Sequence, residues 1–277
     1  MTEPTTASSS TPAQSPGQTI GLFDLSGRVA LVTGAAAGGL GAEAARVLGQ
    51  QGASIVVSDI DTRAKDLQVT AHRLKQQGTP VETAVCDVTD EGQVTTTVAR
   101  VEEGHGGIDI LVNAAGIMLR GSITATSRAD WDRVMGVNVT GTWLTCRAAA
   151  PRMAARGEGK IVNFSTVYAE RVGALPESAY YASKAAVANL TRAVAAEFGP
   201  QGVQVNCLAP GVFYPTRMTE PLAEAPDTLQ WFTDRTLLKR LGRPHRDLDG
   251  PLLLLASAAS DYMTGQTIYV DGGWSAW

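Results

Sequence analysis

The sequence has little cysteine and little histidine, with 3 of each in 277 residues. Cys86, Cys146 and Cys207 include no CxxC pair, so they fit neither a disulfide framework nor a zinc site. We expect them to be buried free thiols. The histidines are scattered along the chain, and no metal-binding constellation is visible, so we predict no metal.

The sequence also lacks a large excess of charge of either sign, and it has no long apolar runs. The formal net charge is -4 and no Lys/Arg cluster occurs, which predicts no nucleic-acid partner. The longest apolar runs, such as 252–256, are far too short to cross a bilayer, so we expect no membrane partner.

Residues 1–19 are mostly Ser, Thr, Pro, Gln and Ala, and they lack the basic start and apolar block of a secretory signal. Such a segment has too little apolar surface to repay the entropy of ordering. We therefore expect residues 1–19 to be a disordered tail, and the protein to be cytoplasmic.

The rest of the chain has a globular composition, with 44% hydrophobic and 18% charged residues. We see no internal repeat and no interdomain linker, so residues 20–277 are predicted to form one domain. Short β-rich runs alternate with helical stretches. The expected strands are 28–33, 53–58, 81–85, 108–112, 160–165, 203–208 and 267–270. The expected helices include 42–51, 94–103, 131–153 (interrupted by Gly141) and 180–198. This alternation predicts an α/β fold, with a doubly wound parallel sheet and helices on both faces.

A glycine-rich turn, Gly34 to Gly41, connects the first strand to the first helix. Strand, glycine turn and helix form the layout that binds a dinucleotide pyrophosphate, because glycines permit close backbone approach and the helix start offers free N–H groups. Asp59 ends the second strand, where an acid binds ribose hydroxyls and repels a 2′-phosphate. Its alternative role is a helix cap. No Arg or Lys occurs in 34–41 or 58–61, so Asp59 predicts NAD.

In such sheets, ligands bind beyond the carboxyl ends of the strands. Several distinctive segments fall at those ends: Gly34–Gly41, Asp59, Asp87, Asn113, Thr166 and Pro210-Gly211. Their agreement is the strongest argument from the residues alone for a ligand site.

Tyr180 and Lys184 lie four residues apart and would share one face of the helix 180–198. A phenol ionises near pH ~10, which is too high for easy proton exchange at neutral pH. An adjacent ammonium would favour the phenolate, so we expect Lys184 to lower the pKa of Tyr180.

Taken together, these motifs resemble the short-chain dehydrogenase/reductase family over residues 22–277. The matching pieces are Thr33-Gly34 through Gly41, Asp87-Val88, Asn113-Ala114-Ala115-Gly116, Asn138, Tyr180-x-x-x-Lys184, Pro210-Gly211 and Asp271-Gly272-Gly273. The resemblance implies a Rossmann-type fold, a nicotinamide cofactor and reversible hydride transfer with a small-molecule carbonyl or alcohol. It also implies a homotetramer.

The resemblance assigns roles to individual residues. Tyr180 would be the general acid/base, Lys184 would also hold the nicotinamide ribose, and Asn138 would anchor a water of the proton relay. The cofactor would be bound by Gly34, Gly39, Leu40, Gly41, Asp59, Ile60, Asp87, Val88, Asn113, Ala114, Ala115, Gly116, Tyr180, Lys184, Pro210, Gly211, Val212 and Thr216.

The sequence departs from the family pattern in three places. The family's catalytic serine is replaced by Thr166, one residue further from Tyr180 than usual. Ser165 is adjacent, but neighbouring strand residues point to opposite faces, so we favour Thr166 and keep Ser165 as the alternative. The glycine loop has one extra residue, and we expect it to bulge at 36–38. Thr216 stands one place late for its usual contact.

The substrate is less determined. The run 261–274 and the segment from Asn113 to Arg120 are similar to those of sugar-acid dehydrogenases acting on gluconate and deoxy-keto-gluconates. Alternatives are a generic ketone or 3-oxoacyl reductase, and a catalytically weak dinucleotide-binding sensor or assembly protein. Arg120 and Arg171 are candidate partners for a substrate carboxylate, or else solvated surface charges. Residues 221–235 are expected to form a helical flap over the substrate, or surface packing.

Overall fold

The computed structural model describes residues 19–277. The tail expected for residues 1–19 lies outside the described residues, except for Thr19. That residue begins the 3-10 helix η1 (Thr19–Phe23).

Seven parallel strands form one sheet in the order β3-β2-β1-β4-β5-β6-β7. The strands are β1 (Val29–Thr33), β2 (Ser54–Asp59), β3 (Val81–Val85), β4 (Ile110–Asn113), β5 (Gly159–Phe164), β6 (Val203–Pro210) and β7 (Thr267–Val270). The order reverses between β1 and β4, which is the switch point where such sheets open a ligand crevice. The predicted α/β fold with a doubly wound parallel sheet is confirmed.

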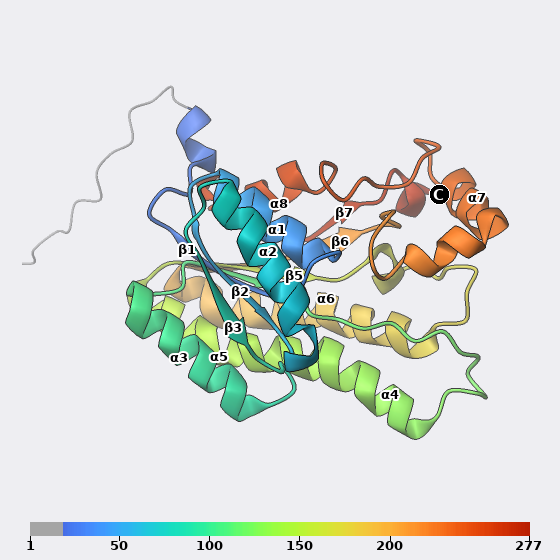
Figure 1. The fold of residues 1–277 in the computed structure, drawn as a ribbon, viewed down its shortest axis with the longest axis horizontal. Coiled ribbons are helices and arrows are strands. Elements are labelled where there is room, and N and C mark those ends of the chain that lie inside the picture. The colour runs from blue at the N-terminus through green and yellow to red at the C-terminus, as the bar shows by residue number, and fades with distance from the viewer. Residues whose placement is uncertain (1–18) are drawn as a thin grey trace, which may run out of the picture.

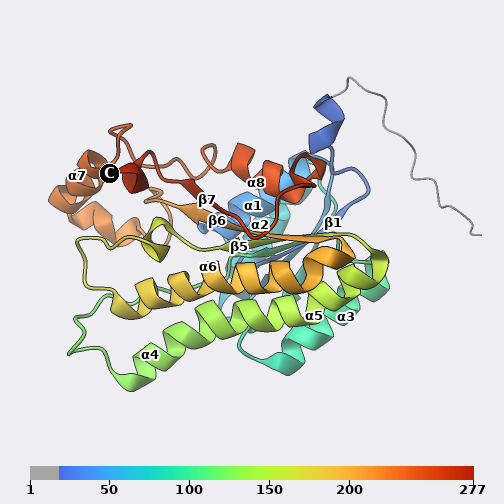
Figure 2. The ribbon, with the colours of Figure 1, turned by 180° about the vertical axis from the view of Figure 1, so that it is seen from behind.

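Helices cover both faces of the sheet (Figure 1). The α-helices are α1 (Leu40–Gln50), α2 (Ala64–Gln76), α3 (Glu91–His105), α4 (Arg128–Met135), α5 (Gly141–Arg156), α6 (Ser178–Phe198), α7 (Pro226–Arg235) and α8 (Asp249–Ala256). Helices α1, α2 and α8 lie on one face, and α3, α5 and α6 lie on the other, as Figure 2 shows from behind. Among residues 19–277, no helix has the length and apolarity needed to span a membrane.

The remaining helical segments are short. They are η2 (Asp61–Arg63), the π-helix η3 (Gly136–Thr140), η4 (Val167–Ala169), η5 (Gly199–Gln201), η6 (Glu220–Glu224), η7 (Ala258–Ser260) and η8 (Trp274–Ala276).

Strand side chains alternate between two cores because successive Cβ atoms point to opposite faces. Within β1, Ala30 and Val32 pack with α1 and α8, whereas Val29 and Leu31 pack toward α3, α5 and α6. Strands that are buried on both faces read as continuous apolar runs, and this explains why the sequence pattern located them well.

The helix predicted for 131–153 is divided differently from expectation. Gly141 does not interrupt it: the backbone passes from α4 through the π-helical turn η3 directly into α5. A Cβ at Gly141 would lie 2.6 Å from Val88 Cγ2, so the glycine serves close packing between α5 and the segment after β3.

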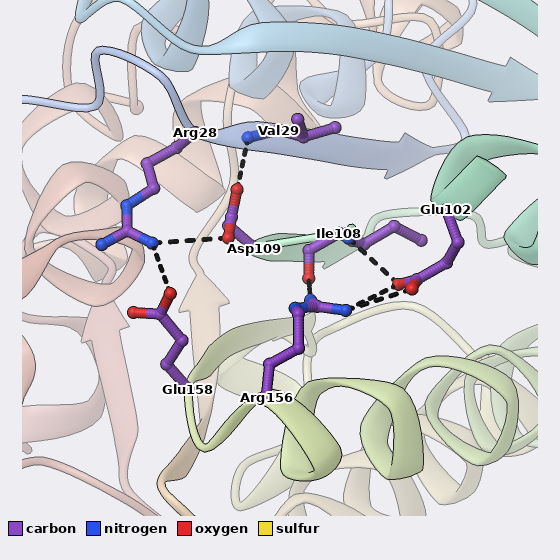
Figure 3. Close-up of polar contacts among 7 residues, drawn as sticks. All are labelled: Arg28, Val29, Glu102, Ile108, Asp109, Arg156 and Glu158. Atoms are coloured by element: carbon purple, nitrogen blue, oxygen red, sulfur yellow. Dashed lines mark hydrogen bonds and ion pairs between the residues drawn. The ribbon is translucent and has the colours of Figure 1, made fainter. Parts of the chain in front are cut away.

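A network of ion pairs lies at the amino ends of the strands (Figure 3). Arg28 directly precedes β1, and it contacts Asp109 before β4 at 3.4 Å and Glu158 before β5 at 2.9 Å. Asp109 Oδ2 also accepts the N–H of Val29 at 2.8 Å. Nearby, Arg156 at the end of α5 pairs with Glu102 of α3 at 3.0 Å, and it donates to the carbonyl of Ile108. These contacts tie helices and strand starts together at the edge opposite the candidate site.

Candidate active site

One cavity of about 1050 Å³ opens at the carboxyl ends of the strands. Most of the predicted site residues line it. They are Gly34, Gly39, Leu40, Asp59, Ile60, Asp87, Val88, Ala114, Ala115, Gly116, Ser165, Thr166, Tyr180, Lys184, Pro210, Gly211, Val212 and Thr216. Gly41, Asn113 and Asn138 lie behind the lining.

The glycine loop folds into a tight cradle. Gly34 has φ +65°, and a Cβ there would lie 2.5 Å from Ala115 Cα. A Cβ at Gly41 would lie 2.3 Å from the carbonyl oxygen of Gly34. Helix α1 begins at Leu40, two residues before the expected start at residue 42, with Gly39 as its N-cap. The extra residue is absorbed just before the helix, where Gly38 has φ +88°.

The N–H groups of this loop are divided into two sets. Ala35, Ala36 and Ala37 donate to Ser58 O, Asp59 Oδ2 and Asp66 O. Gly38 and Gly39 have no acceptor among the described residues, and no side chain caps α1. Free N–H groups at a helix start suit the negative pyrophosphate of a dinucleotide, so the loop fits the predicted cofactor.

Asp59 lies at the end of β2 and lines the cavity, but both of its oxygens already accept backbone N–H groups. Oδ2 accepts from Ala36 and Oδ1 from Ile60, each at 2.9 Å. Asp59 caps neither η2 nor α2, so the helix-cap alternative is not supported. The acid braces the glycine loop and also faces the cavity.

Two arginines that the sequence did not indicate line the same end of the cavity. Arg63 pairs with Asp66 at 2.9 Å and donates to Ala37 O at 3.2 Å. Arg217 pairs with Asp66 at 3.2 Å, and its backbone N–H donates to Gly38 O at 2.8 Å. Arg63 lies just beyond the window 58–61, whereas Arg217 comes from the distant loop after β6, for which no sequence signal existed.

Tyr180 and Lys184 occupy one face of α6, as predicted, and both are buried. The phenolic oxygen of Tyr180 lies 3.9 Å from Met218 Sδ. Lys184 Nζ lies 5.9 Å from the centre of the Tyr180 ring and donates to Phe164 O at 2.8 Å.

The expectation that Lys184 lowers the pKa of Tyr180 is wrong for this arrangement. Burial raises the pKa of the Tyr180 phenol, the charge of Glu177 raises it further, and Thr166 opposes the shift. Lys184 does not offset this, because its ammonium is directed at the Phe164 carbonyl. Burial also lowers the pKa of Lys184 to about 8.

Ser165 and Thr166 follow β5 and direct their hydroxyls differently. Ser165 Oγ donates to Lys184 O of α6 at 2.7 Å. Thr166 Oγ1 donates to Pro210 O at 3.0 Å and lies on the side of Tyr180. This geometry favours Thr166 over Ser165 as the hydroxyl beside Tyr180.

Asn138 is fully buried in the π-helix η3. Its Oδ1 accepts from Ile117 N at 2.8 Å, and its Nδ2 donates to Ile117 O at 2.9 Å and Ser183 Oγ at 2.9 Å. A π-turn commonly marks a functional position in a helix, and here it turns Asn138 toward the loop after β4. Asn138 therefore fixes that loop against α6.

The prediction that Asn113 contacts the cofactor is not supported by its side chain, which lies outside the cavity lining. Asn113 Nδ2 donates to Asn163 Oδ1 at 2.9 Å, and Thr145 Oγ1 donates to Asn113 Oδ1 at 2.8 Å. These buried hydrogen bonds connect β4, β5 and α5. A buried amide is costly unless it is paired, which gives Asn113 a structural role.

The flap predicted for 221–235 is helical, consisting of η6 and α7. Pro221, Leu222 and Phe232 line the cavity. Trp274 was not expected here: it is 1% exposed and packs edge-on against Trp231, with ring centres 5.5 Å apart. The carboxyl end of the chain thus packs against α7, as Figure 1 shows.

The chain is similar to several known proteins. A family model described as enoyl-(acyl carrier protein) reductase matches residues 34–275. The chain is 41% identical over 254 residues to gluconate 5-dehydrogenase of Gluconobacter oxydans, covering 91% of this chain and 96% of that protein. It is 39% identical to galactitol 2-dehydrogenase (L-tagatose-forming) of Cereibacter sphaeroides, covering 92% and 98%.

A solved structure shows the same fold. The gluconate 5-dehydrogenase of Burkholderia cenocepacia, in complex with NADP and tartrate, has a TM-score of 0.88 and 37% identity, covering 94% of this chain and 100% of that one. The fold, the cavity and these relatives agree, and the chain belongs to the short-chain dehydrogenase/reductase family.

Proposed function

We propose that this protein is an NAD(P)-dependent oxidoreductase that interconverts a secondary alcohol and a ketone on a polyhydroxylated small molecule, a sugar alcohol or a sugar acid. The observation that carries the proposal is the convergence of Tyr180, Thr166 and Lys184 in the cavity that also holds the glycine cradle. The relatives named for gluconate and galactitol support the substrate class.

When bound, the nicotinamide cofactor supplies or accepts the hydride. The residues of this chain manage the proton and the geometry. Tyr180 gives a proton to the carbonyl oxygen or takes it from the hydroxyl, which typically contributes ~10²–10⁴-fold to such a step. Thr166 orients the same oxygen by a hydrogen bond.

Lys184 and Asn138 support this pair. The pKa of Lys184 near 8 lets its amine exchange protons close to neutral pH, one helical turn from Tyr180. Asn138 holds Ile117, and with it the loop 114–117 that lines the cavity, in a fixed position.

The residues at the adenosine end fit either nicotinamide dinucleotide, and we propose a preference for NAD(H). Asp59 places a carboxylate where a 2′-phosphate would meet like charge, and Asp66 already pairs with Arg63 and Arg217. Asp59→Ala should therefore weaken the preference. Equal kcat/KM values for NAD and NADP in the unaltered protein would contradict it.

The test of the activity is a substrate panel followed by nicotinamide absorbance, with sugar alcohols, sugar acids and neutral ketones of similar size. Tyr180→Phe should remove turnover and leave NADH binding largely unchanged, because the phenolic hydroxyl is lost while the ring is kept. Near-normal kcat in that variant would refute the mechanism. Binding of NADH without turnover of any substrate would favour the alternative of a dinucleotide-binding sensor.

A further inference from the structure

A buried acid lines the cavity close to Tyr180 in the chain. Glu177 is the residue before α6, one turn ahead of Tyr180, and it is 3% exposed. Its Oε1 accepts from Arg120 Nε at 3.1 Å, and both side chains line the cavity. The backbone fixes this contact, because Gly121 N donates to Pro176 O at 2.8 Å and Gly121 forms an isolated parallel β-bridge with Glu177.

Arg120 is the cation placed to meet a substrate carboxylate, and Glu177 already neutralises it. The other candidate, Arg171, does not line the cavity: it donates to the carbonyls of Glu170 and Ser275 and is exposed. Arg133 lines the cavity and pairs with Asp130 at 3.0 Å. A carboxylate arriving at Arg120 would therefore lie beside a second negative charge.

A hydroxyl group meets no such conflict. It donates to a carboxylate and accepts from a guanidinium, so one hydroxyl can satisfy both members of the pair. The terminal nitrogens of Arg120 have no partner among the described residues, which leaves donors directed to a ligand. Bringing like charges together is unfavourable, whereas this exchange of hydrogen bonds is close to neutral in free energy.

We propose that Glu177 is a specificity-determining residue that makes the site prefer an uncharged polyhydroxylated substrate, a sugar alcohol or its keto form, over a sugar acid. The inference rests on the proposed function and names its substrate class. The inferred preference differs from the substrate named for the gluconate relatives, because it is drawn from the Arg120–Glu177 pair of this chain.

The test uses binding first. Glu177 also acts on Tyr180 by its charge, so kcat would mix two effects. We would titrate galactitol and gluconate by calorimetry into the full-length protein saturated with reduced cofactor, where alcohols bind without turnover. The unaltered protein should bind galactitol more tightly. Glu177→Gln keeps the size of the side chain and removes its charge, and should raise the affinity for gluconate relative to galactitol by ~10-fold or more.

Two further variants sharpen the result. Asp132→Asn removes another acid of the cavity lining, one that pairs with Arg128 at 2.8 Å, and should leave the ratio of the two affinities unchanged. Arg120→Met added to Glu177→Gln should cancel the gain for gluconate.

Equal or tighter gluconate binding by the unaltered protein, with no change of the ratio in Glu177→Gln, would overturn the proposal. So would failure of both ligands to bind to every variant. The expected binding order without turnover of any alcohol by oxidised cofactor would instead refute the proposed enzymatic function and leave the role of Glu177 intact.

Discussion

The hydroxyls of Thr166 and Ser165 contact different elements although the residues are neighbours. Ser165 donates into the backbone of α6, and Thr166 reaches the end of β6 beside Tyr180. We predict that Thr166→Ala lowers kcat by ~10–100-fold, the worth of a hydrogen bond to a charged group. Ser165→Ala should stay within about 3-fold. Thr166→Ser should recover most of the activity, and the opposite ranking would move the role to Ser165.

Lys184 gives a pH dependence of stability with a defined sign. Its folded-state pKa is lowered to about 8 from 10.5, so between these values the unfolded chain binds more protons than the folded one. Unfolding free energy contributed by Lys184 therefore rises with pH across this window, by at most ~3 kcal/mol.

We predict that the unfolding free energy of the unaltered protein rises relative to that of Lys184→Met from about pH 8 upward, measured by urea unfolding without cofactor. Taking the difference removes the contribution of thiols and phenols to the pH dependence, because these groups titrate in both proteins. Lys75→Met, at an exposed position of α2, should give a parallel profile. A parallel profile for Lys184→Met would contradict the assignment.

Sequence motifs located the residues whose chemistry depends on short spacing. Tyr180 and Lys184 are one helical turn apart, so their shared face followed from the sequence. The direction of the Lys184 ammonium did not, because its acceptor, the Phe164 carbonyl, belongs to β5. The side-chain contacts of Asn113 were not predictable for the same reason: its partner Asn163 is distant in sequence, and only the sheet brings the two amides together.

At the scale of elements, the glycine loop shows how closely backbone segments approach. A Cβ at Gly41 would collide with Gly34 O at 2.3 Å, whereas at Gly39 the nearest atom, Ala36 O, would lie at 3.6 Å. Overpacking a rigid contact costs ~1–3 kcal/mol.

We therefore predict that Gly41→Ala weakens NADH binding about 10-fold or more, while Gly39→Ala stays within about 3-fold, measured by fluorescence titration. Equal losses in both variants would show that the helix start, and not the collision, limits binding.

The central strands were predictable because a parallel strand buried on both faces is apolar throughout. The edge strands β3 and β7 are only partly buried, and their β-branched residues still predicted the correct bounds. Helical continuity was harder to predict. The single residue Gly141 suggested a break, but it serves the approach of Val88, a contact between segments that periodicity cannot detect. Similarly, the aromatic contacts of Trp274 join the end of the chain to α7 and had no local signal.

At the scale of the whole molecule, the two edges of the sheet carry different residues. The network of Figure 3 lies at the amino ends of the strands, and the cavity lies at the carboxyl ends. Arg156→Met would leave the Ile108 carbonyl without its donor and Glu102 without its ion pair.

We predict that Arg156→Met lowers the free energy of unfolding by about 1–3 kcal/mol. Each kcal/mol should lower Tm by roughly 2–4 °C, and KM should stay unchanged. Arg128→Met, which breaks a pair on the exposed surface of α4, should shift Tm little. Calorimetry and steady-state kinetics on the same samples would check this, and a raised KM in Arg156→Met would argue for coupling between the edges.

Arg28, Asp109 and Glu158 lie at the amino ends of the strands, away from the cavity. Raising the thermal stability and changing the substrate are therefore separable engineering problems. Substitutions at well-separated positions usually add in free energy. Ion pairs or caps introduced around the strand starts can therefore be selected once and then combined with any altered cavity, without repeating the screen for each new substrate. An evolving chain has the same freedom, since a stabilised amino edge can tolerate the loss of stability that new cavity residues bring.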